Sequence, residues 1–330
     1  MRVTHRMLAQ SVSRNVRDNL TALERKAVQL SSGRCFHRPS HDPAGVYKVM
    51  RLTGTGLYRN EQYQRNIGEG ITWLTITEDA LIEAVDIVQR LKELAVYAAT
   101  GTLTPADREL IAPEVEELFD HLVSIGNTEL GGLYIFGGHQ TQTPPYEKVE
   151  IKSEAIYEKP ENIYEYIGIK YAGDKGAREI EITPSQKLTI NLTGIEFFGG
   201  ERVEGEEEEK IVGAGTDLFL TVRKFINILR GTNGEAVGGE EAGAIIGELE
   251  KRMDHLLQQG AQVGARVKRL QSTEQRLKGE HIHLRELRSK IEDLDLAAAI
   301  TELTMQENAY HAALATGARM IYPSLIDFLR

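Results

Sequence analysis

Residues 287–329 read LRSKIEDLDLAAAITELTMQENAYHAALATGARMIYPSLIDFL, and this stretch decides the fold of the chain. Its apolar residues recur at steps of three and four, a spacing that places them on one face of an α-helix. Between positions 284 and 321 the sequence has no proline, and its only glycine is Gly317. We therefore expect one long terminal helix that begins near position 240 and runs to about position 329.

The terminal helix carries two apolar stripes, so it needs neighbours on two sides. The first stripe consists of Leu284, Leu287, Ile291, Leu294 and Ala298. The second stripe consists of Leu296, Ile300, Leu303, Tyr310, Leu314 and Ile321. The positions between the stripes are expected to face solvent, and they hold the polar residues Glu292, Asp295, Glu302 and Glu307.

The beginning of the chain supplies a matching helix at residues 6–30. Its apolar residues form one narrow stripe with steps of three and four: Val12, Val16, Leu20, Leu23, Ala27 and Leu30. A stripe this narrow is typical of a coiled-coil seam. An isolated helix of this length is only marginally stable in water. We therefore expect it to pair with the terminal helix.

The segments that follow are also predicted to be helical, with recognisable caps. Asp42 before Pro43 and Thr104 before Pro105 have the pattern of an N-cap followed by proline in the first turn. Pro113 either kinks a helix or marks its beginning. Residues 68–73 (GEGITW) are expected to bend the chain, with Thr77 as the N-cap of the next helix.

Residues 146–200 change from helical spacing to the period of two that is typical of strands. The alternation is clear in Ile167, Ile169 and Tyr171, and glycines and a proline separate the alternating runs. We expect a small inserted β domain with its own core. Helical spacing returns at residues 217–230.

The predicted fold class is therefore mainly α, with a long-helix coiled-coil or bundle core formed by the N- and C-terminal segments and a small inserted β domain. We expect three domains. Residues 1–40 and 285–330 form the terminal coiled-coil helices of an axial core. Residues 41–145 and 210–284 form a helical bundle, and residues 146–209 form a β-rich outer domain.

Composition excludes several classes of protein. The 330 residues include 39 Lys and Arg against 49 Asp and Glu, a net charge of −10 that argues against nucleic acid as the main partner. Cys35 is the only cysteine, so no intrachain disulfide and no cysteine-based zinc site can form. The sequence shows neither a run of about 20 apolar residues nor a basic amphipathic face, so we expect no membrane partner. Residues 1–15 lack the apolar core of a secretory signal peptide.

No catalytic, cofactor or metal site is predicted. Ser324 lacks the Gly-x-Ser-x-Gly context of a hydrolase. His281 and His283 are two residues apart on a helix and face different directions, while His37 and His41 have no third ligand nearby. The glycine-rich stretch 130–147 is not followed by the GK[ST] sequence of a phosphate-binding loop. We therefore expect a protein that is not an enzyme and has no cofactor.

Both ends of the chain resemble the flagellin superfamily. LSSGRCFHRPSHDPAG (30–45) is similar to its N-terminal signature, although His41 stands where the family usually has an acidic residue. Residues 77–102 resemble the first hairpin of its core domain. Residues 262–273 and 287–329 resemble its C-terminal core and terminal helix. The resemblance covers roughly residues 1–145 and 210–330.

Two features resemble the hook-associated protein 3 family of hook–filament junction proteins within that superfamily. LGGLYIFGGHQTQTPPYE (130–147) is similar to its Gly-x-Tyr-x-Phe-x-Gly…Thr-x-Pro-Pro stretch, and PSLIDFL (323–329) is similar to its terminus. The insert is also shorter than the outer domains of many flagellins. A flagellin, the filament subunit, remains the alternative, because the two families share the helical scaffold.

The resemblance implies a structural protein that forms a ring of like subunits between hook and filament. It implies three further partners: a hook-associated protein on the hook side, flagellin on the filament side, and a cytoplasmic export chaperone at the C-terminal helix. It also implies export to the extracellular flagellum without a cleaved signal peptide. The predicted assembly interface consists of Val12, Val16, Leu20, Leu23, Leu30, Leu287, Ile291, Leu294, Ile300, Leu303, Tyr310, Leu314, Leu325 and Phe328.

Overall fold

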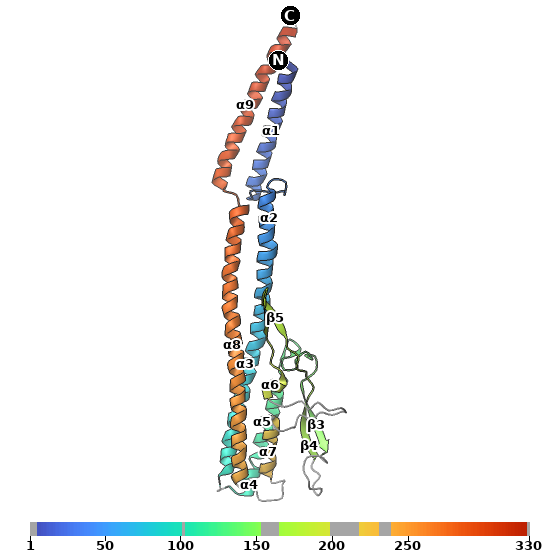
Figure 1. The fold of residues 1–330 in the computed structure, drawn as a ribbon, viewed down its shortest axis with the longest axis vertical. Helices are drawn as coiled ribbons and strands as arrows, with labels where there is room; N and C mark the ends of the chain where they lie inside the picture. The colour runs from blue at the N-terminus through green and yellow to red at the C-terminus, as the bar shows by residue number, and fades with distance from the viewer. Residues whose placement is uncertain (1–4, 101–102, 153–164, 199–217, 231–238, 329–330) are drawn as a thin grey trace. The chain divides into compact units, whose positions relative to one another are not determined.

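A computed structural model describes residues 5–100, 103–152, 165–198, 218–230 and 239–328 (Figure 1). The chain divides into two compact units. Unit 1 comprises residues 1–62 and 277–330, and unit 2 comprises residues 63–276. Both boundaries between the units fall inside long helices, α3 (Tyr58–Ala99) and α8 (Gly239–Glu292).

Unit 1 is built from helices at both ends of the chain. Helix α1 (His5–Ser32) confirms the predicted N-terminal helix, and it runs antiparallel to α9 (Leu296–Phe328), so the two termini lie at the same end of the pair (Figure 1). Helix α2 (Pro43–Arg51) begins as predicted, because the Asp42 side chain accepts a hydrogen bond from the Gly45 backbone N–H at 3.0 Å. It continues into η1 (Leu52–Leu57), a π-helix, and then into α3.

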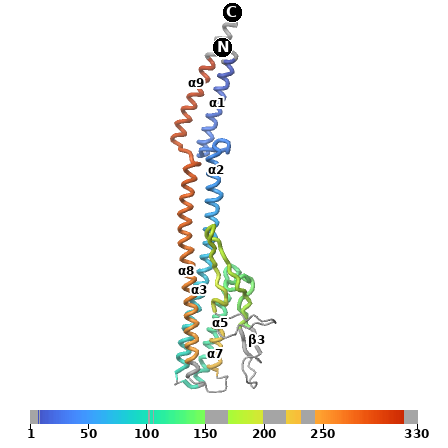
Figure 2. The backbone as a smooth tube through the Cα atoms, in the orientation of Figure 1, coloured from blue at the N-terminus to red at the C-terminus, as the bar shows by residue number. Residues whose placement is uncertain are grey.

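The expectation of one uninterrupted terminal helix is wrong. The chain leaves the helical path at residues 293–295, between α8 and α9 (Figure 2). Asp295 caps the new helix: its side chain accepts hydrogen bonds from the backbone N–H groups of Ala297 at 3.0 Å and Ala298 at 3.2 Å. Such local side-chain bonds compete with continued helix. The apolar spacing continues across the break, and spacing alone therefore could not reveal it.

In unit 2, α3 passes without interruption through the stretch where a bend was expected. Thr77 is fully buried inside the helix, where its hydroxyl donates to the Trp73 carbonyl at 2.9 Å, so it is not an N-cap. Gly70 has a packing role: a Cβ at this position would lie 2.6 Å from the Cδ1 of Ile180. The glycine therefore permits close packing against the inserted segment, and the expected bend and cap are both wrong.

Two helices follow, and the first of them has the predicted cap. The Thr104 hydroxyl accepts from the Asp107 backbone N–H at 3.3 Å at the beginning of α4 (Pro105–Glu109). The side-chain hydrogen bond with Thr104 also holds the pKa of Asp107 below its usual value. Pro113 lies in the first turn of α5 (Ala112–Gly126), so it marks the beginning of a helix and does not kink one.

The inserted segment contains antiparallel strand pairs, as the alternation predicted. Strand β3 (Tyr146–Lys152) pairs with β4 (Glu165–Tyr171), and β5 (Glu179–Thr183) pairs with β6 (Gln186–Thr189). A further short pair, β1 (Glu129–Leu130) with β2 (Leu133–Tyr134), precedes the insert. Helix α6 (Gly194–Phe198) and helix α7 (Leu218–Arg230) come next along the chain. Residues 153–164 and 199–209 of the predicted insert lie outside the described residues.

The insert shares its core with the helices of unit 2. Phe198 packs against Phe219 of α7 with ring centroids 4.6 Å apart, and Phe219 packs against Phe119 of α5 at 5.7 Å. Tyr146 of β3 contacts both Phe198 and Phe219, each at 5.4 Å. Phe198 and Phe219 are also buried. The expected separate β core is therefore not what the segment forms.

Replacing Phe198 with alanine should lower the free energy of unfolding of the protein by about 3–5 kcal/mol, because it removes the centre of this aromatic cluster and leaves a cavity. Urea denaturation followed by circular dichroism measures the change. Tyr97→Ala is the matched control, because Tyr97 is 55% exposed and its loss should change stability by less than about 0.5 kcal/mol. Equal effects of the two substitutions would show that the insert does not contribute to the core.

Candidate assembly interface

Most large apolar side chains of unit 1 are not buried, and we call this arrangement its open apolar core. Among its described residues, only three apolar side chains are buried: Leu57, Leu277 and Ala299. Many large apolar side chains of unit 1 are instead at least 37% exposed: Met7, Leu20, Val28, Tyr47, Met50, Tyr58, Ile282, Leu296, Ile300, Met305 and Leu314. Covering such side chains with a partner would remove apolar surface from water, which is favourable.

Helices α1 and α9 approach closely along their antiparallel pairing. Gly317 is buried, and a Cβ at this position would lie only 2.8 Å from the Cγ1 of Val12. Farther along the pair, the Lys26 ammonium forms an ion pair with the Glu302 carboxylate. Glu302 therefore has a partner on α1, whereas the sequence suggested that it only faces solvent.

The predicted interface residues fall into three groups. Nine are partly buried in unit 1: Val12, Val16, Leu23, Leu30, Leu287, Ile291, Leu294, Leu303 and Tyr310. Three are 42–51% exposed: Leu20, Ile300 and Leu314. Two belong to α9, but their side chains lie outside the described part of the structure: Leu325 and Phe328. The pairing of α1 with α9 thus leaves apolar surface uncovered on both helices.

A backbone joint ties the end of α1 to the break between α8 and α9. The Cys35 N–H donates to the Glu292 carbonyl at 2.8 Å, and the Leu294 N–H donates to the Gly33 carbonyl at 2.9 Å. Gly33 has a φ of 69°, a left-handed conformation that favours glycine. The Cys35 thiol donates to the Asp293 carbonyl at 3.1 Å, so the only cysteine serves this joint.

Glu292 holds the joint electrostatically, although it was expected on a solvent-facing position. The residue is only 9% exposed, and its carboxylate forms ion pairs with Arg34 at 3.0 Å and Arg288 at 3.4 Å. Removing one member of a buried ion pair leaves an uncompensated charge. The sequence offered one signal for this role, the spacing of Arg288 four residues before Glu292.

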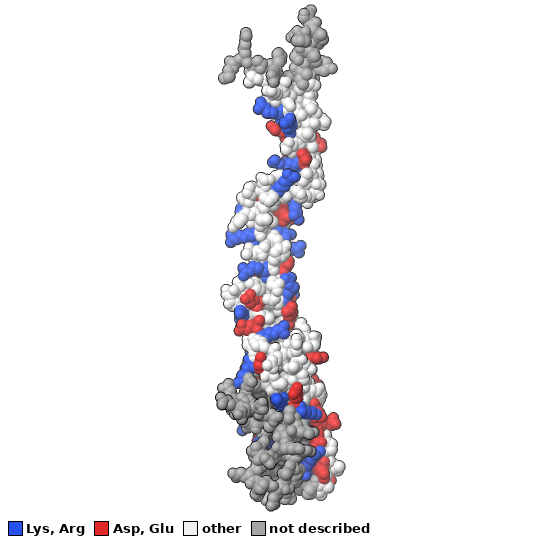
Figure 3. Space-filling model, turned by 90° about the vertical axis from the view of Figure 1, so that its right-hand side faces the viewer, with Lys and Arg blue, Asp and Glu red and all other residues white. Residues whose placement is uncertain are grey.

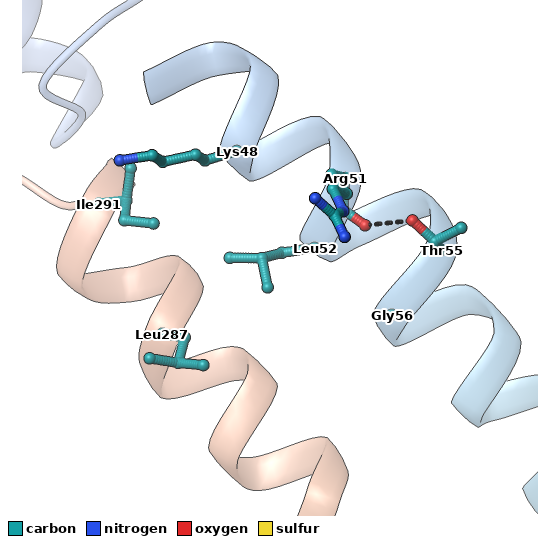
Figure 4. A pocket seen from close by; sticks show the side chains of 7 residues that line it. All are labelled: Lys48, Arg51, Leu52, Thr55, Gly56, Leu287 and Ile291. Carbon is teal, nitrogen blue, oxygen red and sulfur yellow. Dashed lines mark hydrogen bonds between the residues drawn. The ribbon is translucent and has the colours of Figure 1, made fainter. Parts of the chain in front are cut away.

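An open groove of about 480 Å³ lies beside the joint, between the α2–η1 helix and the end of α8 (Figure 4). Leu52, Leu287 and Ile291 are its apolar lining, and Lys48 and Arg51 are its cations. Thr55 and Gly56 complete it, and the Thr55 hydroxyl donates to the Arg51 carbonyl at 2.7 Å. Part of the lining belongs to η1, and π-helical segments are frequent at functional sites.

The cations of the groove are not neutralised locally. Within the described residues, neither Lys48 nor Arg51 forms an ion pair. Residues 1–62 hold 11 Lys and Arg against only 4 Asp and Glu, although the whole chain is acidic. On the face drawn in Figure 3, charged side chains are interspersed with uncharged surface. The groove therefore presents apolar contacts together with unpaired positive charge.

Two features are absent from the described residues: a metal-binding cluster and a helix that could cross a membrane. These residues contain no group of three or more His, Cys, Asp or Glu side chains that could hold a metal ion. No described helix is both long enough and apolar enough to cross a membrane. The exposed apolar side chains and the groove of unit 1 are features found on surfaces that bind other proteins.

Two family profiles match the ends of the chain. Residues 3–141 match the bacterial flagellin N-terminal helical region, and residues 246–329 match the bacterial flagellin C-terminal helical region. Together these regions span more than half of the chain. The chain belongs to the flagellin superfamily. Its two matched regions include α1, most of α8 and α9, which are the elements that build the joint and the open core.

Relatives from this superfamily match nearly the whole chain. The sequence is 24% identical over 319 residues to flagellar hook-associated protein 3 of Escherichia coli K12, covering 95% of both chains. It is 27% identical over 313 residues to the flagellin of Bacillus subtilis, covering 92% of this chain and 91% of that protein. The crystal structure of the flagellar junction protein FlgL from Legionella pneumophila has a similar fold, with a TM-score of 0.54 at 18% identity, covering 76% of this chain and 100% of that chain.

Asp295→Ala should weaken the first turn of α9 by about 1 kcal/mol, because it removes the side chain that accepts the first backbone N–H groups. Hydrogen exchange of the amides of residues 297–303 should become about fivefold faster. Glu307→Ala is the matched control, because Glu307 is exposed on the same helix and forms no ion pair in the described residues. Unchanged exchange in Asp295→Ala would show that the break does not depend on this cap.

Proposed function

We propose that the chain is a structural axial protein of the bacterial flagellum that forms a ring of like subunits at the junction of hook and filament. The observation that carries the proposal is the open apolar core of unit 1. Fully burying one Leu or Ile side chain contributes about 1.5–3 kcal/mol. The exposed apolar residues of α1 and α9 therefore favour association with neighbouring subunits.

In this proposal, residues 1–40 and 285–330 are the axial part, and their partly buried and exposed apolar residues form the contacts between subunits. Residues 41–145 and 210–284 form a second helical part, and residues 146–209 form an outer part that shares the core of these helices. A neighbouring hook-associated protein contacts the hook side, and flagellin contacts the filament side. The near full-length similarity to hook-associated protein 3 of E. coli supports this location.

We further propose that the protein is exported to the flagellum unfolded, without a cleaved signal peptide, and that a cytoplasmic chaperone covers the C-terminal helix beforehand. Two observations support this route. The apolar side chains of α9 are exposed at Leu296, Ile300, Met305 and Leu314, so they need a cover before assembly. The chain also has no disulfide that would have to be reduced for export.

A filament subunit is the second candidate, and the similarity to the flagellin of B. subtilis over most of both chains favours it. Immunogold labelling of flagella distinguishes the two. A junction protein gives one band between hook and filament, whereas a filament subunit is labelled along the whole filament. Label along the filament would reject the junction in favour of the flagellin.

Leu294→Asp and Leu303→Asp should be exported and yet fail to hold the filament on the hook, so that flagellin is shed into the medium. Each substitution places a carboxylate in a partly buried apolar site, which costs several kcal/mol unless the group is protonated. Immunoblots of shed flagellin and counts of filaments on cells measure the loss.

The control for these variants is Glu307→Lys, which should be mild because an exposed helix position tolerates a charge change. Glu302→Lys is unsuitable because it would replace the ion pair with Lys26 by two like charges. Normal filament attachment in both Leu→Asp variants, with both proteins exported, would contradict the proposed role of the α1–α9 surface.

The two terminal helices should be mobile in the monomer and become ordered only when neighbours cover them, since each has few buried contacts. Hydrogen exchange of residues 5–32 and 296–328 in free and assembled protein tests this expectation. The amides should exchange faster in the free protein. Strong and equal protection in both states would refute the mobility, while leaving the location at the junction open to its own test.

A further inference from the structure

We propose that the groove of unit 1 in one copy receives an acidic face of α3 from unit 2 of a second copy. We call the face formed by Asp79, Ile82 and Asp86 the acidic face. This inference rests on the proposed function, because it specifies which surfaces of like subunits meet. It assigns one occupant to the groove described above.

The groove requires a partner that supplies both apolar contact and negative charge. Its lining from Leu52, Leu287 and Ile291 is apolar, and Lys48 and Arg51 have no acidic partner within the described residues. Three large side chains near these cations in the sequence are exposed: Tyr47 at 66%, Met50 at 66% and Tyr58 at 64%. Tyr, Met and Arg are enriched in protein–protein interfaces, whereas a solvated helix face normally lacks such a combination.

The acidic face has the complementary composition. Asp79, Ile82 and Asp86 follow each other at steps of three and four, so they lie on one side of α3. Ile82 is 56% exposed between the two carboxylates. Neither Asp79 nor Asp86 forms an ion pair with another described residue.

Other charged residues of the same helix already have partners. Glu83 pairs with His121 of α5 at 2.9 Å, and Arg90 pairs with Glu114 of α5 at 2.7 Å. Lys92 pairs with Glu250 of α8 at 2.6 Å. These pairs hold α3 against its neighbours within unit 2. The unpaired carboxylates of the acidic face are therefore available to an outside partner.

Each surface places two charged side chains around apolar surface. Asp79 and Asp86 are separated by about 10 Å along the helix at 1.5 Å per residue. Lys48 and Arg51 lie only about 4.5 Å apart along α2 by the same rise, so their long side chains have to spread apart to meet the two carboxylates while Ile82 enters the apolar groove between them. This arrangement pairs two cations with two anions around one buried apolar side chain.

The charge of the two units favours this contact over one between identical surfaces. Unit 1 holds 17 Lys and Arg against 12 Asp and Glu, whereas unit 2 holds 22 against 37. Opposite charge steers the two surfaces together, and like charge opposes a contact of either surface with itself. A contact between two different surfaces of like subunits repeats from copy to copy and generates rings or filaments.

Disulfide trapping between two purified full-length chains tests the contact directly. Both chains carry Cys35→Ser, which removes the native thiol and keeps a hydrogen-bond donor at the joint. One chain also carries Thr55→Cys in the groove, and the other carries Ile82→Cys on the acidic face. Because each chain then has a single cysteine, a trapped pair is always intermolecular.

Under mild oxidation the mixed dimer of Thr55→Cys with Ile82→Cys should form about tenfold faster than a control dimer of Thr55→Cys with Ser272→Cys, a difference that corresponds to about 1.4 kcal/mol. Ser272 is exposed on α8 of unit 2, away from the acidic face in the sequence. Equal rates for the two dimers would overturn the proposal. Equal rates would instead indicate that the groove binds a partner other than a second copy of the chain.

Charge reversal provides the second arm. Adding Lys48→Glu and Arg51→Glu to the Thr55→Cys chain should reduce trapping to the control rate. Adding Asp79→Lys and Asp86→Lys to its Ile82→Cys partner should then restore the tenfold preference. An unchanged rate of trapping after the first charge reversal would contradict the charge pairing. So would a rate that stays at the control value after the second reversal.

The result of the trapping experiment can be distinguished from the result of the immunogold labelling that tests the proposed function. The trapping experiment uses purified protein and does not depend on where the protein lies in the flagellum. Labelling along the whole filament would reject the junction role and leave a positive trapping result standing. Labelling at the junction with no preferential trapping would keep the junction role and reject this contact.

Discussion

Two paired helices cannot shield all of each other's apolar surface from water, and this constraint governs unit 1. Helix α1 has one narrow apolar stripe, and α9 has apolar residues on more than one side. Their antiparallel pairing brings Val12 against Gly317, but it leaves Ile300 and Leu314 exposed. A pair of helices encloses no interior, so partner molecules must supply the remaining apolar contacts.

The joint between Gly33–Cys35 and Glu292–Leu294 determines how this pairing begins. Backbone hydrogen bonds have fixed geometry, so the two bonds set the position of the end of α1 relative to the beginning of α9. Glu292 adds ion pairs to Arg34 and Arg288 at the same place. The break at residues 293–295 also gives α9 an N-terminal cap of its own. The pairing of α1 with α9 is thus anchored at one end by specific polar bonds and continued by apolar packing.

Local signals in the sequence predicted local structure well. The caps at Asp42 and Thr104 depend on side chains within three residues of the helix they begin, so their pattern is visible without a structure. The apolar spacing of residues 6–30 likewise predicted α1. The same reasoning placed Leu287 and Ile291 in the predicted interface set; both line the groove, and their role in assembly stays a prediction.

The failures share a physical cause, which is dependence on residues distant in the chain. The break at Asp293–Asp295 is held by Gly33 and Cys35, more than 250 residues away in the sequence. Glu302 meets Lys26 only because α9 folds back along α1. The sequence suggested that the chain bends at Gly70, whereas in the structure this glycine leaves room for the side chain of Ile180. Periodicity reports which side of an element is apolar, but it does not report which distant segment covers that side.

The two units differ in role: unit 2 contributes stability, and unit 1 contributes surface for association. Unit 2 buries an aromatic cluster and most of the apolar core of the chain. Unit 1 exposes apolar side chains, and its Lys48 and Arg51 form no ion pair with any described residue. If unit 1 were also closed, the chain would be a stable monomer without a strong tendency to associate. An open unit attached to a closed one keeps the chain folded while it retains the surface from which an assembly can be built.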